Sequence, residues 1–255
     1  MKRIAAILAT AALAAGCGGQ SMDQWVKERL TPQSASDRIV RIENGQADQR
    51  REGLQKLAAD PAARKTASVV KLFCLVAQTD EDPMVRSAAV RGLAEMEGDG
   101  VVAALTAVAT RDKSPFVRAD AAKSLGRHPG PETIAALAQV RTNDSNEDVR
   151  VAAAEALRQF KEKAAAEALV AALADSSLAV SLKAWESLRY MTGQDFARSP
   201  EPWDDFFAKI DDPFLLYGRP PALPKGRNQR PQFTKGPLDF INGLFAKDVR
   251  EAELE

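Results

Sequence analysis

Apolar residues recur along the middle of the chain with the spacing of an amphipathic helix. Val85, Ala89 and Leu93 follow one another at intervals of four residues, and a similar set occurs three more times. Positions i, i+4 and i+8 lie on one face of a helix, so each set predicts a helix with one buried face. The four sets are Val85, Ala89 and Leu93; Val117, Ala121 and Leu125; Val149, Ala153 and Leu157; and Val180, Ala184 and Leu188.

A helix-start signal precedes each set. Pro83 and Pro115 occupy the first helical position, where a missing backbone N–H is tolerated. A second apolar helical run, such as Val101 to Ala109, lies before each start signal. The unit is therefore two helices joined by a short turn. The expected N-cap residues, whose side chains can accept a backbone N–H, are Asp82, Ser114, Asn146 and Ser177.

The units stand in register over most of the chain. Arg86, Arg118 and Arg150 are 32 residues apart, and Ser181 takes the equivalent place 31 residues later. A weaker fifth copy, with Arg50, Gly53 and Leu57, lies 36 residues before the first of these units. Units of this length that repeat in register predict a solenoid, in which neighbours bury one continuous core.

The shared pattern D/S-x-x-V-R-x-x-A-x-x-x-L resembles the HEAT-like repeats first described in phycobilisome lyases. The resemblance covers residues 36–197 and implies an all-α, right-handed α/α superhelix of about five units. The sequence MTGQDF, residues 191–196, precedes Trp203 and Phe207. This arrangement resembles the cap that follows the last HEAT-like unit in many bacterial envelope proteins, which implies an aromatic capping helix over residues 198–210.

The first residues have the pattern of an export signal. Lys2 and Arg3 precede a predominantly apolar region of 12 residues, which is too short to span a bilayer of about 30 Å. Ala14-Ala15-Gly16 leads into Cys17, which resembles a bacterial lipoprotein signal, although Ala14 stands where Leu is usual. The resemblance implies cleavage after residues 1–16 and a lipid on Cys17.

The same resemblance implies a cellular location. No Asp follows Cys17, so the resemblance implies the bacterial envelope and the periplasmic face of the outer membrane. Residues 17–35 are then a tether and an N-terminal cap. The alternative is an ordinary cleaved signal with an incidental cysteine.

The C-terminal region differs from the repeats. Residues 211–236 are rich in Pro and, between Pro213 and Leu238, carry basic residues and no acid. They predict an extended linker, which is either a solvated tail or a contact with anionic lipid headgroups or another acidic surface. Residues 237–255 predict an amphipathic helix that docks back on the solenoid or binds a partner. Its apolar positions are Leu238, Ile241, Leu244, Phe245 and Val249.

The composition excludes several classes of site. Lys and Arg total 35, as do Asp and Glu, so no bulk positive charge favours a nucleic-acid partner. One histidine and two cysteines disfavour a zinc site, an iron–sulfur cluster and a disulfide framework. We expect His128 to be exposed in a turn and Cys74 to be a small residue in the core. We therefore assign no catalytic residue, metal or cofactor.

Two sets of repeated residues are candidates for contacts. Arg86, Arg118 and Arg150 predict a ladder along the solenoid, which either braces adjacent units or binds anions. Five residues after each position of this ladder, the charge changes from basic to acidic along the solenoid. This column predicts a bipolar protein-binding groove on the concave face, although a solvated helix face gives the same pattern. Its members are Arg91, Lys123, Glu155 and Glu186.

Aromatic residues near the end of the repeats add to this candidate surface. Trp185 and Tyr190 are possible anchors, because aromatic side chains dominate interface energetics. Trp185 could equally fill the gap after the last unit.

These patterns together favour a non-catalytic protein-interaction scaffold anchored in the envelope by its lipid. One alternative is a structural envelope protein that acts through the basic arm. The other is an enzyme, because relatives of the repeat include bilin lyases and isomerases.

Overall fold

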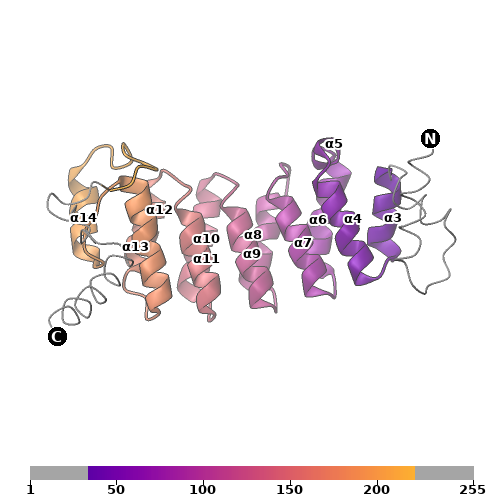
Figure 1. Cartoon of the computed structure of the whole chain (residues 1–255), viewed down its shortest axis with the longest axis horizontal. Helices are drawn as coiled ribbons and strands as arrows, with labels where there is room; N and C mark the ends of the chain where they lie inside the picture. Colours follow the sequence, from indigo (N-terminus) through magenta and orange to yellow (C-terminus); the bar gives the residue numbers. More distant parts are fainter. Residues whose placement is uncertain (1–33, 222–255) are drawn as a thin grey trace, which may run out of the picture.

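The chain forms a row of helices arranged in sequence order along one long axis (Figure 1). The structure, a computed structural model, describes residues 34–221. These residues contain twelve α-helices and no strand, which confirms the all-α solenoid predicted from the repeats. None of the twelve is long and apolar enough to cross a membrane. The expected signal segment, Cys17, the residues up to 33, the arm beyond 221 and the C-terminal helix lie outside the described residues.

Ten of the twelve helices form five antiparallel pairs. We call the first member of each pair an A helix and the second a B helix. Two helices stand outside the pairs: the short α5 (Pro61–Arg64) connects α4 to α6, and α14 (Pro200–Lys209) follows the last pair. The pairs are α3 (Ala35–Asn44) with α4 (Ala47–Ala58), α6 (Ala67–Thr79) with α7 (Pro83–Leu93), α8 (Val101–Arg111) with α9 (Pro115–Leu125), α10 (Pro131–Asn143) with α11 (Glu147–Leu157), and α12 (Lys163–Ala172) with α13 (Leu178–Thr192).

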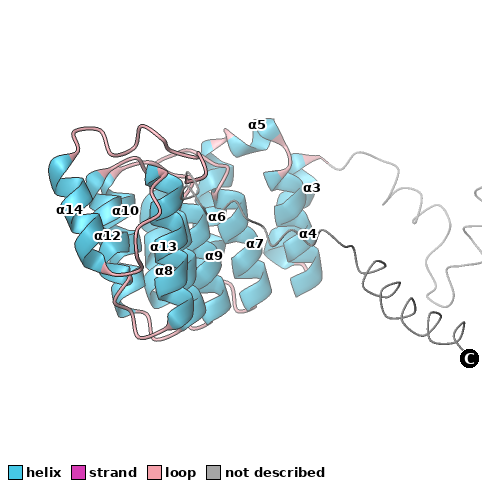
Figure 2. Ribbon diagram, turned by 60° about the vertical axis from the view of Figure 1, so that its left-hand side comes forward, coloured by secondary structure: helices cyan, strands magenta, loops and turns pink. Residues whose placement is uncertain are grey.

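The repeated apolar columns form the core. All twelve residues of the Val, Ala and Leu columns are completely buried. Each B helix packs against its own A helix and against the next B helix, so α4, α7, α9, α11 and α13 form one layer. Figure 2 shows α13, α9, α7 and α4 following one another in this order. Burying a Val or Leu side chain contributes about 1.5–3 kcal/mol, so the columns hold adjacent repeats together.

The expected N-cap residues occupy the N-cap positions, but only two of the four B-helix caps use their side chains. Asp82 accepts hydrogen bonds from the amides of Met84 and Val85, and Asn146 accepts one from Val149. The side chains of Ser114 and Ser177 make no cap hydrogen bond. The hydroxyl of Ser177 donates instead to Glu147 of the preceding repeat, so it links repeats rather than capping its helix.

Gly92 allows three helices to approach closely. A Cβ atom at this position of α7 would overlap the ring of Phe73 in α6 and would lie 3.3 Å from the Cβ of Ala58 in α4. The absence of a side chain at Gly92 therefore makes room for Phe73, which is completely buried.

The cap after the last repeat is larger than the sequence predicts. The indole of Trp203 in α14 is completely buried and donates to the backbone oxygen of Ala197 at 2.9 Å. Residues 211–221, which we expected to begin the extended linker, fold back against α13 and the end of α11. Tyr217 donates from its hydroxyl to the oxygen of Arg158, and the amide of Gly218 donates to the oxygen of Tyr190. The linker therefore cannot begin at 211, because aromatic packing retains this segment on the fold.

Candidate protein-interaction surface

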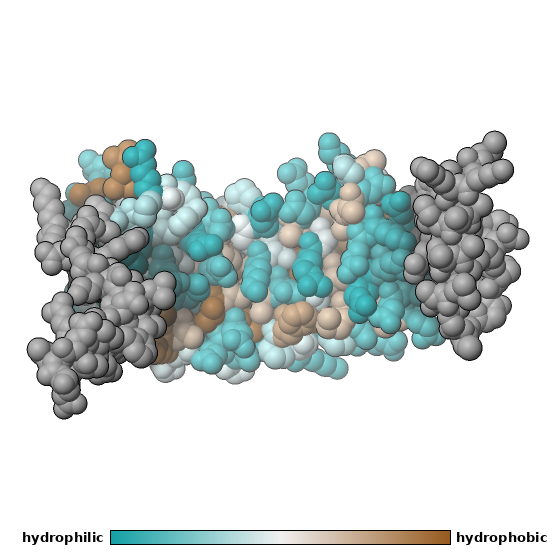
Figure 3. All heavy atoms as spheres, viewed as in Figure 1, coloured by the Kyte–Doolittle hydropathy of each residue, from teal (hydrophilic) through white to brown (hydrophobic). Residues whose placement is uncertain are grey.

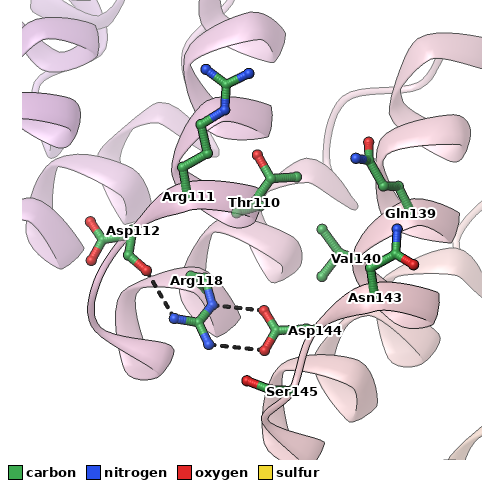
Figure 4. A pocket seen from close by; sticks show the side chains of 10 residues that line it. Thr110, Arg111, Asp112, Arg118, Gln139, Val140, Asn143, Asp144 and Ser145 are labelled. Carbon is green, nitrogen blue, oxygen red and sulfur yellow. Dashed lines mark hydrogen bonds and ion pairs between the residues drawn. The ribbon is translucent and has the colours of Figure 1, made fainter.

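The arginine ladder joins each repeat to the next. In Figure 4, Arg118 of α9 lies between the turn that precedes its own helix and the turn that follows α10. Its Nε and Nη2 donate to the two carboxylate oxygens of Asp144 at 2.7 and 2.9 Å. Its Nη1 donates to the backbone oxygen of Asp112 at 2.8 Å. One guanidinium therefore fixes both turns in a two-point geometry that lysine cannot reproduce.

The same contact recurs at every junction between the described repeats. In each case an Arg in the first turn of a B helix donates to an Asp in the turn that follows the next A helix, and these hydrogen bonds raise the pKa of the guanidinium. The Asp carboxylate also accepts the amide two residues further along. The pairs are Arg50 with Asp80, Arg86 with Asp112, Arg118 with Asp144, and Arg150 with Asp175.

These pairs decide between the two interpretations of the ladder. Each guanidinium is nearly buried and binds an internal carboxylate, so the ladder braces the units rather than offering a stripe for anions. Arg50 occupies the equivalent place in α4, which confirms the weak fifth copy. Ser181 replaces Arg in α13, which is the last B helix among the described residues and is followed there by no further repeat that could supply an aspartate.

The sequence contained a signal for the aspartates that we did not use. Each lies two residues before the N-cap of a B helix, and three of them, Asp80, Asp112 and Asp144, recur at the 32-residue period of the arginines. Asp82 caps α7, whereas Asp80 pairs with Arg50 of the preceding repeat.

The outward face of the B helices carries a groove of about 450 Å³ between α9 and α11. We call it the B-face groove. Exposed Phe116 and half-buried Ala119 and Val151 form its apolar part, and charged side chains rim it. In Figure 3, small hydrophobic patches lie among hydrophilic side chains along the row. The rim residues are Asp120 and Lys123 from α9, and Asp148 and Glu155 from α11.

The groove brings together two members of the predicted charge column, Lys123 and Glu155. Arg91 lies on the preceding B helix and approaches Asp120 at 3.9 Å, while its side chain stays half exposed. Lys123 is exposed and makes no ion pair within residues 34–221. The basic end of the column thus stays more available than the acidic end, where intrahelical partners approach the carboxylates. These pairs are Glu155 with Arg158, and Glu186 with Lys183.

The two candidate aromatic anchors contact the cap. Trp185 donates from its indole to the oxygen of Phe196 at 2.8 Å, and Arg189 stacks on its ring. Its equivalents in earlier repeats are smaller and completely buried: Val90, Ala122 and Ala154. Trp185 therefore fills the gap after the last repeat, as the alternative interpretation expects. Tyr190 packs edge-on against Tyr217, and 39% of it remains exposed.

His128 is less exposed than expected, whereas Cys74 packs against the core as expected. His128 is half-buried, because its Nε2 donates to the oxygen of Leu93 in the preceding repeat at 3.0 Å. Burial lowers the pKa of this imidazole. Cys74 is also half-buried, and burial raises the pKa of its thiol, which disfavours the nucleophilic thiolate. Within residues 34–221, no group of three His, Cys, Asp or Glu side chains is placed to hold a metal ion.

The stacked helix pairs, the continuous core and the repeated ion pairs define an α-helical repeat solenoid. Residues 70–155 and 136–199 match the family model described as HEAT repeats. Because the two matches together span slightly more than half of the chain, the protein belongs to the HEAT-repeat family.

Comparison with solved structures gives a more distant likeness. The crystal structure of an engineered protein from the Northeast Structural Genomics Consortium is similar, with 18% sequence identity and a TM-score of 0.43. The likeness covers 72% of this chain and 94% of the engineered one. None of the curated proteins matches the chain.

Proposed function

We propose that this protein is a non-catalytic scaffold that binds a protein partner on its B-helix face and is held in the bacterial envelope by a lipid on Cys17. HEAT solenoids typically present extended surfaces to partners rather than catalytic groups. The observation that carries the proposal is the B-face groove, where apolar side chains lie exposed beside charged ones.

The exposed apolar residues of this face are spread over several B helices. Met84 of α7, Phe116 of α9 and Leu182 of α13 are 42%, 46% and 40% exposed. Phe116 lines the groove together with Val151 of α11. Apolar side chains that gather among polar ones are typical of interaction surfaces, and large side chains such as Phe contribute much of the binding energy.

The charges around the groove favour a protein partner. Arg91 and Lys123 lie toward the N-terminal repeats, and Asp148 and Glu155 lie on the following helix. A partner with the opposite order of charges gains both orientation and association rate from this arrangement. The chain as a whole is electrically neutral, which does not favour a nucleic acid.

The anchor and the location form the second part of the proposal. The run of small residues that leads into Cys17 supports a processed, lipid-bearing cysteine. More than one acyl chain gives stable attachment, because each buried CH₂ group contributes about 0.8 kcal/mol. The absence of an Asp after Cys17 supports the periplasmic face of the outer membrane.

A cross-linked pull-down from the native envelope tests the scaffold function. The tagged full chain is compared with Phe116→Ser, which removes the most exposed apolar side chain of the groove. The matched control is Leu75→Ser on α6, which changes a residue that is 58% exposed and does not line the groove. We expect a stoichiometric partner that the groove variant loses and the control retains. A partner retained by both variants would place the binding site elsewhere, and no partner at all would argue against a scaffold.

Fractionation tests the anchor separately. We expect the unaltered chain to enter the detergent-soluble membrane fraction and to incorporate labelled palmitate. Cys17→Ser should abolish both properties, whereas Cys74→Ser should change neither. A Cys17→Ser protein that stays in the membrane fraction would contradict the lipid anchor.

A further inference from the structure

We infer that the B-face groove is occupied, in the absence of a partner, by the chain's own residues 238–249. The inference rests on the proposed function, because it assigns an intramolecular regulator to the same groove. A partner would then have to displace this segment before it could bind.

The order of charges is the first argument. On the N-terminal side of the groove, Lys123 of α9 lines it and Arg91 of α7 lies beside it, and both are exposed. The carboxylate on this side, Asp120, is approached by Arg91, and its side chain is only 12% exposed. The carboxylates Asp148 and Glu155 come from α11, on the C-terminal side. A segment that runs along the B face from the C-terminal end toward the N-terminal end therefore meets acidic side chains first and basic side chains second.

The chain beyond Pro221 carries the opposite order. Residues 222–236 contain four basic residues and no acid, so they match the acidic end of the groove. Residues 248–255 contain four acids and one base, so they match Arg91 and Lys123. Between these blocks lies the apolar stripe that fits the apolar part of the groove. Complementary charge in this sense sets the direction of docking. The stripe is Leu238, Ile241, Phe245 and Val249, with Leu244 at its edge.

The place where the described chain ends is the second argument. Its last residues lie beside α13, because the amide of Gly218 donates to the oxygen of Tyr190 at 2.8 Å and Tyr217 packs on the Tyr190 ring. Tyr190 belongs to a B helix, so the chain leaves the fold next to the B-helix layer. Neighbouring helices in a solenoid are about 10 Å apart, which puts α9 about 20 Å from α13.

The chain beyond Pro221 is long enough to follow this path. The 16 residues from 222 to 237 can span up to about 50 Å when extended. A helix of 12 residues, 238–249, would be about 18 Å long, which matches the width of two neighbouring B helices. An amphipathic helix in an apolar groove is a common recognition mode, and the tether raises its effective concentration to about the millimolar range.

Photo-cross-linking in the full chain tests the inference. The photoreactive p-benzoyl-phenylalanine replaces Phe245, which lies in the apolar stripe, or Phe240, which lies on the opposite face of a helix with this sequence. We expect the probe at 245 to form an intramolecular cross-link to α9 or α11, with at least fivefold higher yield than the probe at 240. A cross-linked dimer, a cross-link to another protein, a cross-link elsewhere on the chain or equal yields would overturn the inference.

Charge reversal tests the direction of docking. Arg91→Glu with Lys123→Glu should lower the cross-link yield from position 245 at least fivefold. Adding Glu251→Lys and Glu253→Lys should restore it. Lys65→Glu with Lys71→Glu, which changes the net charge equally at exposed positions that do not line the groove, should leave the yield unaltered. Failure of the compensating pair to restore the yield would contradict the proposed direction.

The two proposals can fail separately. If the cross-link forms but the pull-down finds no partner with the full chain or with a chain ending at 221, the docking stands and the scaffold function fails. If a partner requires Phe116 but no cross-link forms, the scaffold function stands and the docking fails.

Discussion

Arg118 and Asp144 belong to successive repeats and hold each other in a two-point ion pair at 2.7 and 2.9 Å. The side chains are 14% and 7% exposed, so water screens the pair weakly. Removal of one partner leaves the other charge buried, which is why such pairs are more costly to break than surface ion pairs.

We expect Asp144→Ala to lower the free energy of unfolding by about 3 kcal/mol, because Arg118 would lose its carboxylate. Urea denaturation followed by circular dichroism measures the change. Asp99→Ala, at an exposed loop residue, is the control and should stay within about 0.5 kcal/mol of the unaltered chain. An equal loss in the two variants would show that the ladder does not brace the repeats.

The ladder also predicts sensitivity to acid. Burial acts to raise the pKa of Asp144 and of Asp175, but the hydrogen bonds from Arg118 or Arg150 and from a backbone amide outweigh it, so both values are lowered. The unfolded chain then binds protons at a higher pH than the folded chain does. The stabilisation from these two carboxylates is complete at pH values above 3.8, the ordinary pKa of aspartate. It is lost as the pH falls through their lowered pKa values in the folded chain.

Urea denaturation between pH 6 and pH 2.5 measures this dependence. Asp175→Asn should show a shallower loss below pH 4 than the unaltered chain, because one of the contributing carboxyls is gone. Parallel curves for the two proteins would contradict the assignment.

His128 predicts a second pH dependence, in a different range. Burial lowers the pKa of its imidazole below the ordinary 6.5, so the unfolded chain is protonated first as the pH falls. Stability should therefore decrease from pH 7.5 to pH 5.5, with a slope of at most about 1.4 kcal/mol per pH unit for one proton. His128→Gln should remove this slope, and calorimetry at a series of pH values measures it. A slope that persists in the variant would assign it to another group.

Gly92 tests the close approach of three helices. Alanine favours a helix over glycine by about 1 kcal/mol, but its Cβ would overlap Phe73, and overpacking costs about 1–3 kcal/mol. We expect Gly92→Ala to destabilise the fold. Combination with Phe73→Leu should recover part of the loss, since the smaller side chain makes room. Additive losses in the double variant, measured by urea denaturation, would argue against a direct clash.

The periodic part of the fold could be predicted because each column has one physical role. Val85, Ala89 and Leu93 and their equivalents are buried as their spacing requires, and the brace formed by Arg86, Arg118 and Arg150 follows from one arginine in each unit. Their aspartate partners were missed because they lie 25–30 residues away along the chain. A search for columns in the turns as well as in the helices would have found them.

The ends of the solenoid were harder to predict. Trp185 is a residue type that often anchors a binding interface, and only the structure shows that its indole bonds to the backbone of Phe196. The same holds for residues 211–221, where a Pro-rich composition predicts an extended chain but Tyr217 and Gly218 bond to the last two repeats. His128 was misjudged because its partner, the Leu93 oxygen, belongs to another repeat and carries no sequence signal.

The direction of the ladder has a consequence for synthesis on the ribosome. Each arginine pairs with an aspartate that follows it by 25–30 residues. During synthesis, the arginine of a new repeat therefore has no carboxylate partner until the next repeat has left the ribosome. At 5–20 residues per second this interval lasts about 1–6 s. The last described repeat has Ser181 in place of the arginine, so it needs no later aspartate. It packs instead against aromatic residues that directly follow it in the chain.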